Sequence, residues 1–466
     1  MTAIDTASTA DTDARLRRVR EALGDRLVTA TDAGYDDLRT PWNVAIDQRP
    51  LAVVRPESTQ EVIDVVRSAS AAGLRLAPQA TGHMAAGLSA TDLSDVILVD
   101  MSALRSVTVD PTARTARLDG GATWNDVLAQ SAPHGLTALH GSAGSVGAVG
   151  YLLGGGLSFY GRAHGLAVGD VRSIEVVTAD GSLHRAGPDE DAELFWALRG
   201  GSGAFGVVVA VTISLRPLAT VIAGMLLWDA SRADEVTRAW SAWTRTAPDT
   251  ATTTLRIMNF PPMPELPPFL AGRSVVVIDG AILGSDAAAS TLLGPLRALA
   301  PEVDTFARIP SADLVGVHMD PPGPAPAVTA HSVLDALPAA AAGAFVEAGS
   351  IPGIFVSELR HIGGAFAQSP AGGGAVASLP GQYIMHTIAI VSAPELAAPM
   401  TAAVRAGVGL LDRWRIDALA LTFIDAPDED RALGFGPAAR RLQTLKGILD
   451  PGDLFVAGNP VPQPRR

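Results

Sequence analysis

Two glycine-bearing stretches hold the residues whose types and spacing could do chemistry. Residues 140–170 are dense in glycine, which alternates with apolar residues, and a strand-like run follows at 171–178. Glycine has no Cβ, so its backbone N–H groups can lie against phosphates or a flat ring. Because glycine in ordered structure costs about 0.5–1 kcal/mol per position, this density favours a ligand-binding loop over a set of ordinary tight turns.

His83 ends the second stretch. It closes an expected strand within the turn Gln79-Ala80-Thr81-Gly82-His83, and small residues follow it. Such a turn can present several N–H groups to an anion, with an imidazole at its edge. A histidine in a loop is often only a polar surface residue, so spacing alone leaves a functional and a structural interpretation open.

Other motifs point away from familiar chemistries. The GxGxxG match at 201–206 follows an expected helix and precedes an expected strand, whereas a dinucleotide fingerprint needs the opposite order. The nine histidines are scattered, with no HExxH motif and no carboxylate cluster, so no metal site is expected. Residues 143–147 lack the first glycine of a GxSxG nucleophile elbow.

Composition narrows the class of protein. A chain of 466 residues predicts two or three domains, and 48% hydrophobic with 18% charged residues is typical of a globular protein. The net charge of −13 argues against a nucleic-acid partner. There is no cysteine, hence no disulfide, thiolate metal site or cysteine nucleophile. No apolar run reaches the roughly 18 residues of a membrane span, so we expect a cytoplasmic protein without a membrane partner.

The elements that must position these stretches can be read from periodicity. Residues 58–61 have a capping-box pattern, and the helix after them lies between two short strands, which forms a βαβ unit leading into the His83 turn. Leu16, Val19, Leu23 and Leu27 indicate an earlier amphipathic helix. The other strands of the first half are expected at 96–100, 106–109, 115–119, 173–178 and 207–215.

The second half of the chain has a different amino-acid composition. It is rich in alanine and contains two proline-rich loops, 261–268 and 321–326, that are too donor-poor for a sheet interior. We expect strands near 252–259, 274–283, 384–391 and 416–424, and an amphipathic helix near 431–448. The fold class is therefore α+β, with a second domain built on an antiparallel sheet covered by helices.

Four blocks in a fixed order give a family resemblance. They are Gln79 to His83, the run 141–156, the segment 194–201 with 206–208, and the tail from Asp450-Pro451 through Phe455, Asn459 and Pro460. In these blocks the sequence resembles the vanillyl-alcohol-oxidase superfamily of PCMH-type FAD-dependent oxidoreductases, in its berberine-bridge-enzyme-like and 6-hydroxynicotine-oxidase-like branch. The resemblance covers about residues 46–218 and 431–462.

The resemblance implies how FAD is held. The first turn would wrap the pyrophosphate, and His83 would be joined to the flavin 8α-methyl carbon. Ala143 stands where bicovalent relatives have a cysteine, so a second thioether link is impossible. Gln79 replaces the usual arginine and Thr81 a glycine, which departs from the family's turn. Val146 occupies a position where valine leaves room for oxygen at the flavin, which favours an oxidase.

The same resemblance implies a wider set of FAD contacts. Gly154, Gly155 and Gly156 would approach the isoalloxazine edge, Val207 and Val208 would flank the adenine, and Asn459 would bond to the pyrimidine side. The full expected set is Gln79, Ala80, Thr81, Gly82, His83, Ala143, Ser145, Val146, Gly147, Gly150, Gly154, Gly155, Gly156, Gly161, His164, Gly165, Gly206, Val207, Val208, Phe455 and Asn459.

The implied domain plan has four parts. Residues 1–45 are an N-terminal extension with a helix, 46–218 the PCMH-type FAD-binding domain, and 219–425 the substrate (cap) domain. Residues 426–466 are a berberine-bridge-like segment that returns to the FAD-binding domain.

The catalytic base is expected on the strand that holds Tyr383 and His386. Alternation along a strand puts these two on opposite faces, so one of them lines the pocket. We favour His386, because an imidazole can take a proton near neutral pH. Both could instead be ordinary sheet residues. The tyrosine that relatives often carry near the C-terminal block is absent, since Phe423 and Ile424 stand there. Further candidates are Tyr151, Tyr160, Glu358 and His361.

The sequence therefore predicts an oxidase with monocovalent FAD. It would abstract a hydride from a C–H next to an alcohol, amine or phenol of a small, natural-product-like substrate, with O2 as acceptor and H2O2 as product. A flavin dehydrogenase with another acceptor and a non-catalytic flavin-bound scaffold remain alternatives. Neither substrate identity nor oligomeric state follows from the sequence.

Overall fold

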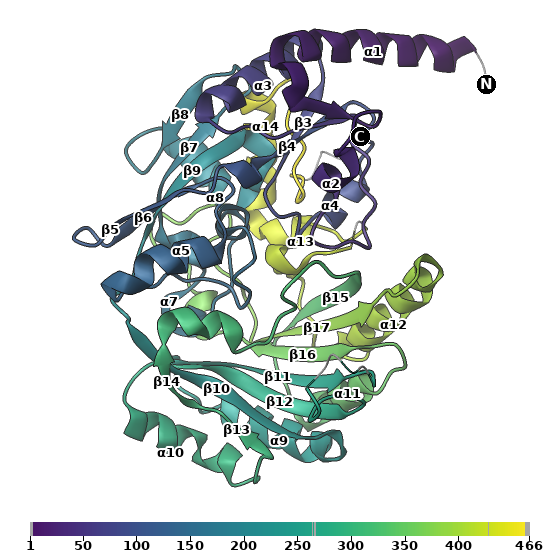
Figure 1. The fold of residues 1–466 in the computed structure, drawn as a ribbon. Coiled ribbons are helices and arrows are strands. Elements are labelled where there is room, and N and C mark those ends of the chain that lie inside the picture. Colours follow the sequence, from purple (N-terminus) through teal and green to yellow (C-terminus); the bar gives the residue numbers. More distant parts are fainter. Residues whose placement is uncertain (1–2, 263, 265–266, 427, 462–466) are drawn as a thin grey trace.

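Three β-sheets organise the chain in this computed structural model, which describes residues 3–262, 264, 267–426 and 428–461. Two smaller sheets occupy the upper half of Figure 1, and one eight-stranded sheet occupies the lower half. Residues 1–2, 263, 265–266, 427 and 462–466 lie outside the described residues. They include parts of the expected N-terminal extension, proline-rich loop and C-terminal segment. No helix in the described part of the chain has the length and apolar character needed to cross a bilayer.

The first sheet contains the expected βαβ unit. Its strands lie in the order β1 (Leu27–Thr29), β2 (Ala52–Val54), β4 (Val96–Asp100) and β3 (Arg75–Gln79). The last three are parallel, and α3 (Thr59–Ala72) connects β2 to β3. The Glu61 N–H donates to the Ser58 hydroxyl at 3.2 Å, which caps α3. This unit ends at Gln79, and the turn that contains His83 follows directly.

The second sheet is antiparallel and carries the glycine-rich stretch. Its strands lie in the order β5 (Val107–Asp110), β6 (Thr115–Asp119), β9 (Val207–Ser214), β7 (Val171–Val177) and β8 (Leu183–Ala186). The helices beside it are α5 (Trp124–Ser131), α6 (Ala148–Leu153), α7 (Gly161–His164) and α8 (Ala192–Gly201). Residues 140–170 fold as turns around the short α6 and α7, and they lie between β6 and β7 in the sequence.

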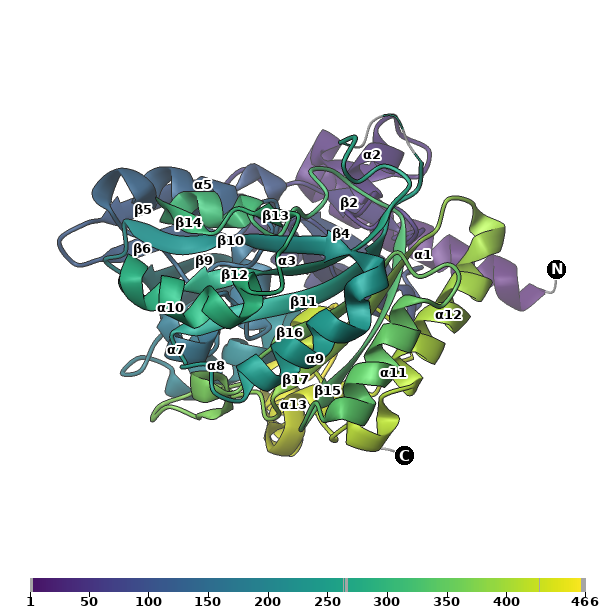
Figure 2. The same cartoon turned by 90° about the horizontal axis from the view of Figure 1, so that it is seen from below.

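The large sheet is antiparallel and has two different faces. Its strands are β13 (Val303–Asp304), β10 (Thr220–Asp229), β12 (Ser274–Ile282), β11 (Ala251–Asn259), β16 (Val356–His361), β17 (Tyr383–Ile390) and β15 (Ala327–Leu334), with β14 (Ala307–Pro310) also paired to β10. The helices α9 (Ala233–Thr244), α10 (Asp286–Arg297), α11 (Ala339–Gly349) and α12 (Ala397–Gly409) cover its outer face (Figure 2). Trp240 and Phe345 pack there against Leu255, Leu359 and Met385. The inner face is turned toward the two smaller sheets.

Three expected elements differ from the structure. Residues 416–424 do not form a strand: after a single bridge between Leu334 and Arg415, the chain makes a 3-10 turn at Leu421–Phe423. The helix expected at 431–448 is divided into α13 (Ala432–Phe435) and α14 (Ala439–Leu449), because Gly436 adopts a φ of 50° and Pro437 follows it. Leu27 leaves the first helix, α1 (Ala3–Leu23), and begins β1 instead.

The tail returns to the first sheet. The Leu76 N–H donates to the Leu454 carbonyl at 2.7 Å, and the Val456 N–H donates to the Leu76 carbonyl at 2.8 Å. These two bonds add the tail to the free edge of β3. A Cβ on Gly87, in α4 (Ala86–Ser89), would lie 1.6 Å from the Gly458 carbonyl oxygen. The tail thus packs directly on the segment that follows His83.

Candidate functional site

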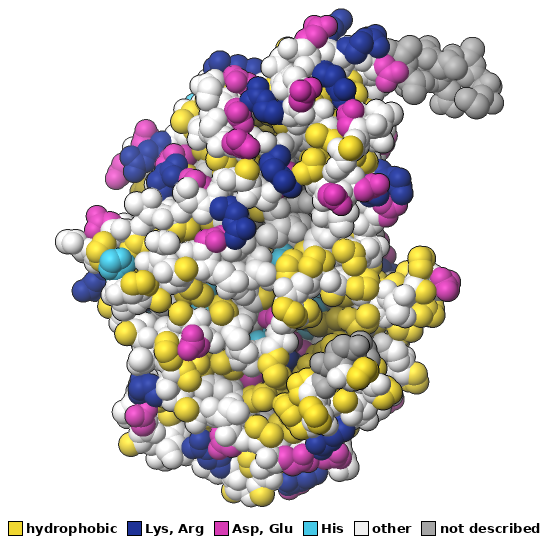
Figure 3. Space-filling view, viewed as in Figure 1, with side chains coloured by type: hydrophobic (Ala, Val, Ile, Leu, Met, Phe, Trp, Pro, Cys, Tyr) yellow, Lys and Arg dark blue, Asp and Glu magenta, His cyan; other side chains and the backbone are white. Residues whose placement is uncertain are grey.

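A cavity of about 400 Å³ lies between the smaller sheets and the inner face of the large sheet. One side, which we call the cradle wall, consists of the cavity-lining residues within 79–85, 141–154 and 458–459. The opposite side, which we call the sheet wall, consists of Asp320, Thr329, Arg360, His386 and residues 422–425. Figure 3 shows histidine side chains in the band between the two halves, on a face where positive and negative side chains are mixed. The volume falls within the range of small-ligand pockets.

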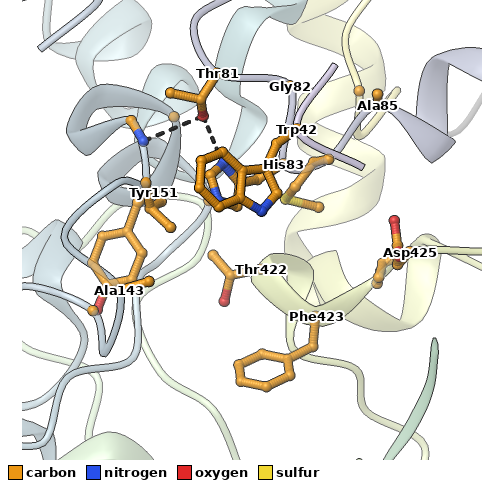
Figure 4. A pocket seen from close by; sticks show the side chains of 18 of the residues that line it. Trp42, Thr81, Gly82, His83, Ala85, Ala143, Tyr151, Thr422, Phe423 and Asp425 are labelled. Carbon is orange, nitrogen blue, oxygen red and sulfur yellow. Dashed lines mark hydrogen bonds between the residues drawn. The ribbon is translucent and has the colours of Figure 1, made fainter. Parts of the chain in front are cut away.

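The two glycine-bearing stretches meet at the cradle wall. The Gly147 N–H donates to the Thr81 hydroxyl at 3.4 Å, which joins the first turn to the start of α6 (Figure 4). Gly82 has a φ of 73°, and a Cβ there would lie 2.6 Å from the Pro41 Cβ, so only glycine fits this turn. Among the expected FAD contacts, those that line the cavity are Gln79, Ala80, Thr81, Gly82, His83, Ala143, Val146, Gly147, Gly150, Gly154 and Asn459.

His83 is held from two sides. Its Nδ1 is hydrogen-bonded to the Thr81 hydroxyl at 2.7 Å, and its ring stacks on Trp42 with centroids 4.4 Å apart and 16° between the planes (Figure 4). Burial lowers the pKa of His83 to about 4. The imidazole is therefore neutral at physiological pH, and one ring nitrogen carries an unprotonated lone pair.

The sheet wall is charged and highly connected. Arg360 forms an ion pair with Glu358, and its Nη2 lies 3.1 Å from the His318 Nε2. His318 Nδ1 lies 3.0 Å from an Asp279 carboxylate oxygen, and Asp279 also pairs with Arg256. Burial opposes ionisation of Glu358, yet the nearby Arg360 and His318 hold the pKa of that carboxyl well below its usual value. These groups are buried as a compensated network rather than as isolated charges.

His386 and Tyr383 point to opposite faces of the large sheet. His386 lines the cavity beside its cross-strand neighbours Glu358 and His331. Its Nδ1 is buried and has no partner among the described residues, and burial lowers the pKa of His386 to about 4. The Tyr383 hydroxyl instead bonds to the Thr244 hydroxyl at 2.7 Å under α9. Tyr383 therefore does not line the cavity, because the strand's alternation turns it into the helix-covered core.

Ten of the expected FAD contacts do not line the cavity. They are Ser145, Gly155, Gly156, Gly161, His164, Gly165, Gly206, Val207, Val208 and Phe455. Several are packing positions: a Cβ on Gly161 would lie 1.8 Å from the Phe366 ring, and one on Gly206 would lie 2.6 Å from Val176. Phe455 is bridged to Leu76 in the core.

His164 lines a different cavity. This second cavity, of about 550 Å³, also has Asp170 and Arg216 in its lining, where the two side chains form an ion pair at 2.8 Å. The expectation that His164 contacts the cofactor is therefore not supported by its position.

Of the further candidates for the catalytic base, some line the first cavity and others lie away from it. Tyr151 lines the cavity and meets Trp124 edge-on, whereas the Tyr160 ring packs against His140. Glu358 forms an ion pair with Arg360 in the buried network behind the sheet wall. His361 Nε2 is 2.9 Å from Arg162 Nη1, and its ring stacks on Tyr383, away from the cavity.

Sequence reasoning missed several lining residues, of which Trp42 and Asp425 are the most notable. Trp42 lies in an irregular segment before β2, where no motif marks it. Asp425 follows the 3-10 turn, and its Oδ2 accepts a hydrogen bond from the Asn43 side chain at 3.2 Å. Burial raises the pKa of Asp425 to about 7. The sequence shows that this segment lacks the tyrosine often found in the family. A carboxyl two residues after Phe423 was the one feature there that could have pointed to Asp425.

Comparisons with known proteins agree with this arrangement. Residues 50–187 match the family model described as an FAD binding domain. The chain is 33% identical over 205 residues to the FAD-linked oxidoreductase pytB of Aspergillus terreus, which covers 44% of this chain and 25% of that protein. It is 33% identical over 198 residues to (R)-6-hydroxynicotine oxidase of Paenarthrobacter nicotinovorans, covering 42% of this chain and 43% of the relative. The chain thus spans less than half the length of these two relatives.

One solved structure extends the likeness to nearly the whole chain. The BBE-like 1 protein of Physcomitrella patens superposes with a TM-score of 0.81 at 18% identity, covering 97% of this chain and 100% of that one. This likeness establishes the fold, including the large antiparallel sheet that the family model does not reach.

The cavity lining fits an FAD. Eight buried polar atoms on it have no partner within the described residues, and these belong to Gln79, Tyr151, Asp320, Thr329, His386, Thr422, Asp425 and Asn459. Each unsatisfied buried polar atom costs about 1–3 kcal/mol, so their gathering on one cavity indicates a ligand with many hydrogen-bonding groups. Residues 50–187 thus match an FAD binding domain, and the chain that contains them has the two-domain α+β fold of the BBE-like 1 protein.

Proposed function

We propose that this protein is an FAD-dependent oxidase. It would abstract a hydride from a C–H next to an alcohol, amine or phenol of a small, natural-product-like substrate, with O2 as the final acceptor and H2O2 as product. The observation that carries the proposal is a single cavity in which the cradle wall of an FAD binding domain faces a charged sheet wall. The bound flavin supplies the two-electron acceptor, and the protein supplies orientation and exclusion of water.

The cradle wall would hold the cofactor. The turn at 79–83 can offer its N–H groups to the pyrophosphate, and the segment 143–150 can lie along the ring system. Asn459 has a buried side-chain oxygen without a partner in the described chain, and its amide suits the pyrimidine edge of the ring. Val146 lines the same cavity, and a valine at this position would leave room for O2 at the flavin, as the family resemblance implies.

His83 would link the flavin covalently. Trp42 and Thr81 fix the imidazole plane, and the lowered pKa of His83 keeps a ring nitrogen unprotonated at neutral pH. Both conditions favour a bond from histidine to the 8α-methyl carbon. With no cysteine in the chain, the link would be monocovalent.

The sheet wall would orient the substrate. Arg360 is held by Glu358 and His318 and lies over the Phe423 ring at 5.0 Å, so its position is fixed before substrate binds. His386 offers a neutral imidazole whose Nδ1 is free among the described residues. It is the sequence-derived candidate for the group that hydrogen-bonds the substrate hydroxyl or amine.

The spectrum of the purified protein tests the proposal. Yellow colour should stay with the acid-precipitated pellet, and His83→Ala should release it to the supernatant. A colourless protein that shows no flavin absorbance after reconstitution would overturn the proposal.

A second assay tests turnover. Oxygen consumption and peroxide release should follow addition of an oxidisable alcohol, amine or sugar from a broad panel. Reoxidation by an artificial acceptor alone would indicate a dehydrogenase, and a flavin that stays oxidised against the whole panel would indicate a non-catalytic scaffold.

A further inference from the structure

We propose that Asp425 is the group that accepts the proton released by the substrate, an inference that rests on the oxidase activity proposed above. Asp425 lines the cavity together with its neighbours Thr422, Phe423 and Ile424, and these four residues belong to the sheet wall (Figure 4). No motif or family match singled it out.

The two oxygens of the Asp425 carboxyl have different surroundings. Oδ2 accepts a hydrogen bond from the Asn43 side-chain amide at 3.2 Å. Asn43 is itself fixed to β15, since its amide donates to the Ala327 carbonyl at 2.9 Å and its oxygen accepts from the Ala327 N–H at 3.1 Å. Oδ1 is buried and has no partner among the described residues. One oxygen is therefore anchored, and the other is available to a ligand in the cavity.

The charges around Asp425 come from its own loop and from the sheet edge. Burial raises the pKa of Asp425 to about 7, with Glu429 adding to the rise while Asn43 and Arg431 oppose it. Glu429 in turn lies 3.8 Å from His331 on β15. A carboxyl with a pKa close to the working pH is suited to taking up and giving back a proton.

The other titratable groups of the sheet wall are less suited to this role. Glu358 is tied to Arg360, and Asp279 to Arg256, so neither carboxylate is free. His386 is neutral, but burial lowers its pKa to about 4, which makes it a weak proton acceptor. We therefore assign orientation of the substrate to His386 and proton uptake to Asp425. Asp417, an exposed carboxyl earlier in the same irregular segment, serves as the matched control.

The proton transfer balances as follows. The O–H or N–H bond of the substrate breaks, and its electron pair forms the new C=O or C=N bond. The carbon-bound hydrogen leaves with its own electron pair to the oxidised flavin, which is the oxidant. The proton forms an O–H bond with the Asp425 carboxylate, which later returns it to solvent.

Anaerobic flavin reduction as a function of pH tests the assignment. The holoenzyme would be mixed with 6-hydroxynicotine, 4-hydroxybenzyl alcohol or xylobiose, and the substrate that reduces the flavin would then be used throughout. In the wild type the reduction rate should rise with pH through about 7. Asp425→Asn should lower the rate at pH 8 by about 100-fold or more and remove the pH-dependent rise, while Asp417→Asn should keep that rise.

Glu429→Gln gives a milder second variant. Because the Glu429 charge raises the pKa of Asp425, this variant should shift the rise to lower pH without abolishing it. Infrared difference spectra of the holoenzyme give a readout independent of turnover. Burial also raises the pKa of Glu429 to about 7, so two protonated carboxyl bands should titrate near pH 7 in the wild type and in His386→Asn. The band of Asp425 is the one that Asp425→Asn removes and that Glu429→Gln leaves in place at lower pH.

The outcomes separate this proposal from the oxidase activity itself. If the wild-type flavin is reduced and Asp425→Asn behaves like the wild type, or if Asp425→Asn removes no carboxyl band that titrates near pH 7, the role of Asp425 is wrong and the oxidase stands. If His386→Asn alone removes the pH-dependent rise, the imidazole is the base. If no panel substrate reduces the wild-type flavin, both proposals are overturned.

Discussion

The two walls of the cavity are built by opposite means. The cradle wall uses backbone: glycines and small residues bring main-chain atoms close together, and its one titratable side chain in the first turn is a neutral histidine. The sheet wall uses side chains, with Arg360 and His386 on alternate positions of paired strands and a buried ion network behind them. Backbone can hold a cofactor whose shape does not vary. Side chains can be exchanged one at a time, so the sheet wall is where we expect substrate specificity to reside.

Substitution of Gly87, which packs the tail beside the cradle wall, should have the largest effect on flavin binding. Gly87→Ala would place a Cβ 1.6 Å from the Gly458 carbonyl oxygen, where backbone atoms must move apart. We expect the tail to be displaced, with loss of flavin retention and of roughly 2–3 kcal/mol of unfolding free energy. Flavin content and chemical denaturation measure the two effects. Gly447→Ala, in α14 with nothing within 4 Å of its Cβ, is the matched control: it should leave flavin content unchanged and should raise stability slightly, because alanine favours a helix more than glycine does.

Breaking the ion network of the sheet wall should come next. Arg360→Leu leaves Glu358 and His318 buried without their guanidinium partner, and one-sided loss of a buried pair costs about 3–5 kcal/mol. Unlike the glycine variant, it should leave the FAD contacts of the cradle wall in place, so flavin content at low temperature should stay near the wild-type value. Equal loss of flavin in both variants would contradict the division into two walls.

Acid should weaken the protein through the buried histidines of both walls. The folded-state pKa values of His83 and His386 are each lowered by burial to about 4, below the ordinary value of 6.5. Their contribution to stability is therefore complete above pH 6.5 and is lost as pH falls toward 4, by on the order of 1–3 kcal/mol per group. His386→Asn should reduce the slope of unfolding free energy between these pH values. An unchanged slope would show that His386 is not neutral in the fold.

The smallest effect is expected on the outer face of the large sheet. Tyr383→Phe removes the hydrogen bond to Thr244 under α9 and should cost about 1 kcal/mol of stability. The rate of flavin reduction should not change, because the hydroxyl lies on the face opposite His386. A rate loss comparable to that of His386→Asn would place Tyr383 in the reaction after all.

The cradle wall could be predicted from sequence because its signal is local. The turn at Gly82-His83 and the run 141–154 are contiguous, and both line the cavity. The same signal also covers glycines that pack against side chains, since an added Cβ on Gly161 would meet Phe366 and one on Gly206 would meet Val176. Close approach to a side chain and close approach to a ligand select the same residue, and only the fold distinguishes them.

The sheet wall could be predicted only in part, because its residues come together through the pairing of strands that are far apart in the sequence. Strand alternation placed His386 and Tyr383 on opposite faces, which the structure confirms. That His386 lies between Glu358 and His331 depends on the pairing of β16, β17 and β15, and no spacing within the chain reveals it. Trp42 and Asp425 lie in irregular segments, where neither periodicity nor turn chemistry marks them.

The pairing of the tail with β3 has a consequence for the order in which the protein folds during synthesis. Asn459 and Met84 lie side by side although 375 positions separate them in the chain. Closing so long a loop is entropically unfavourable until the intervening domain has folded. The cradle wall can therefore close only after residues 458–459 have been synthesised, and a nascent chain with only its first two sheets would offer FAD a half-site that lacks Asn459.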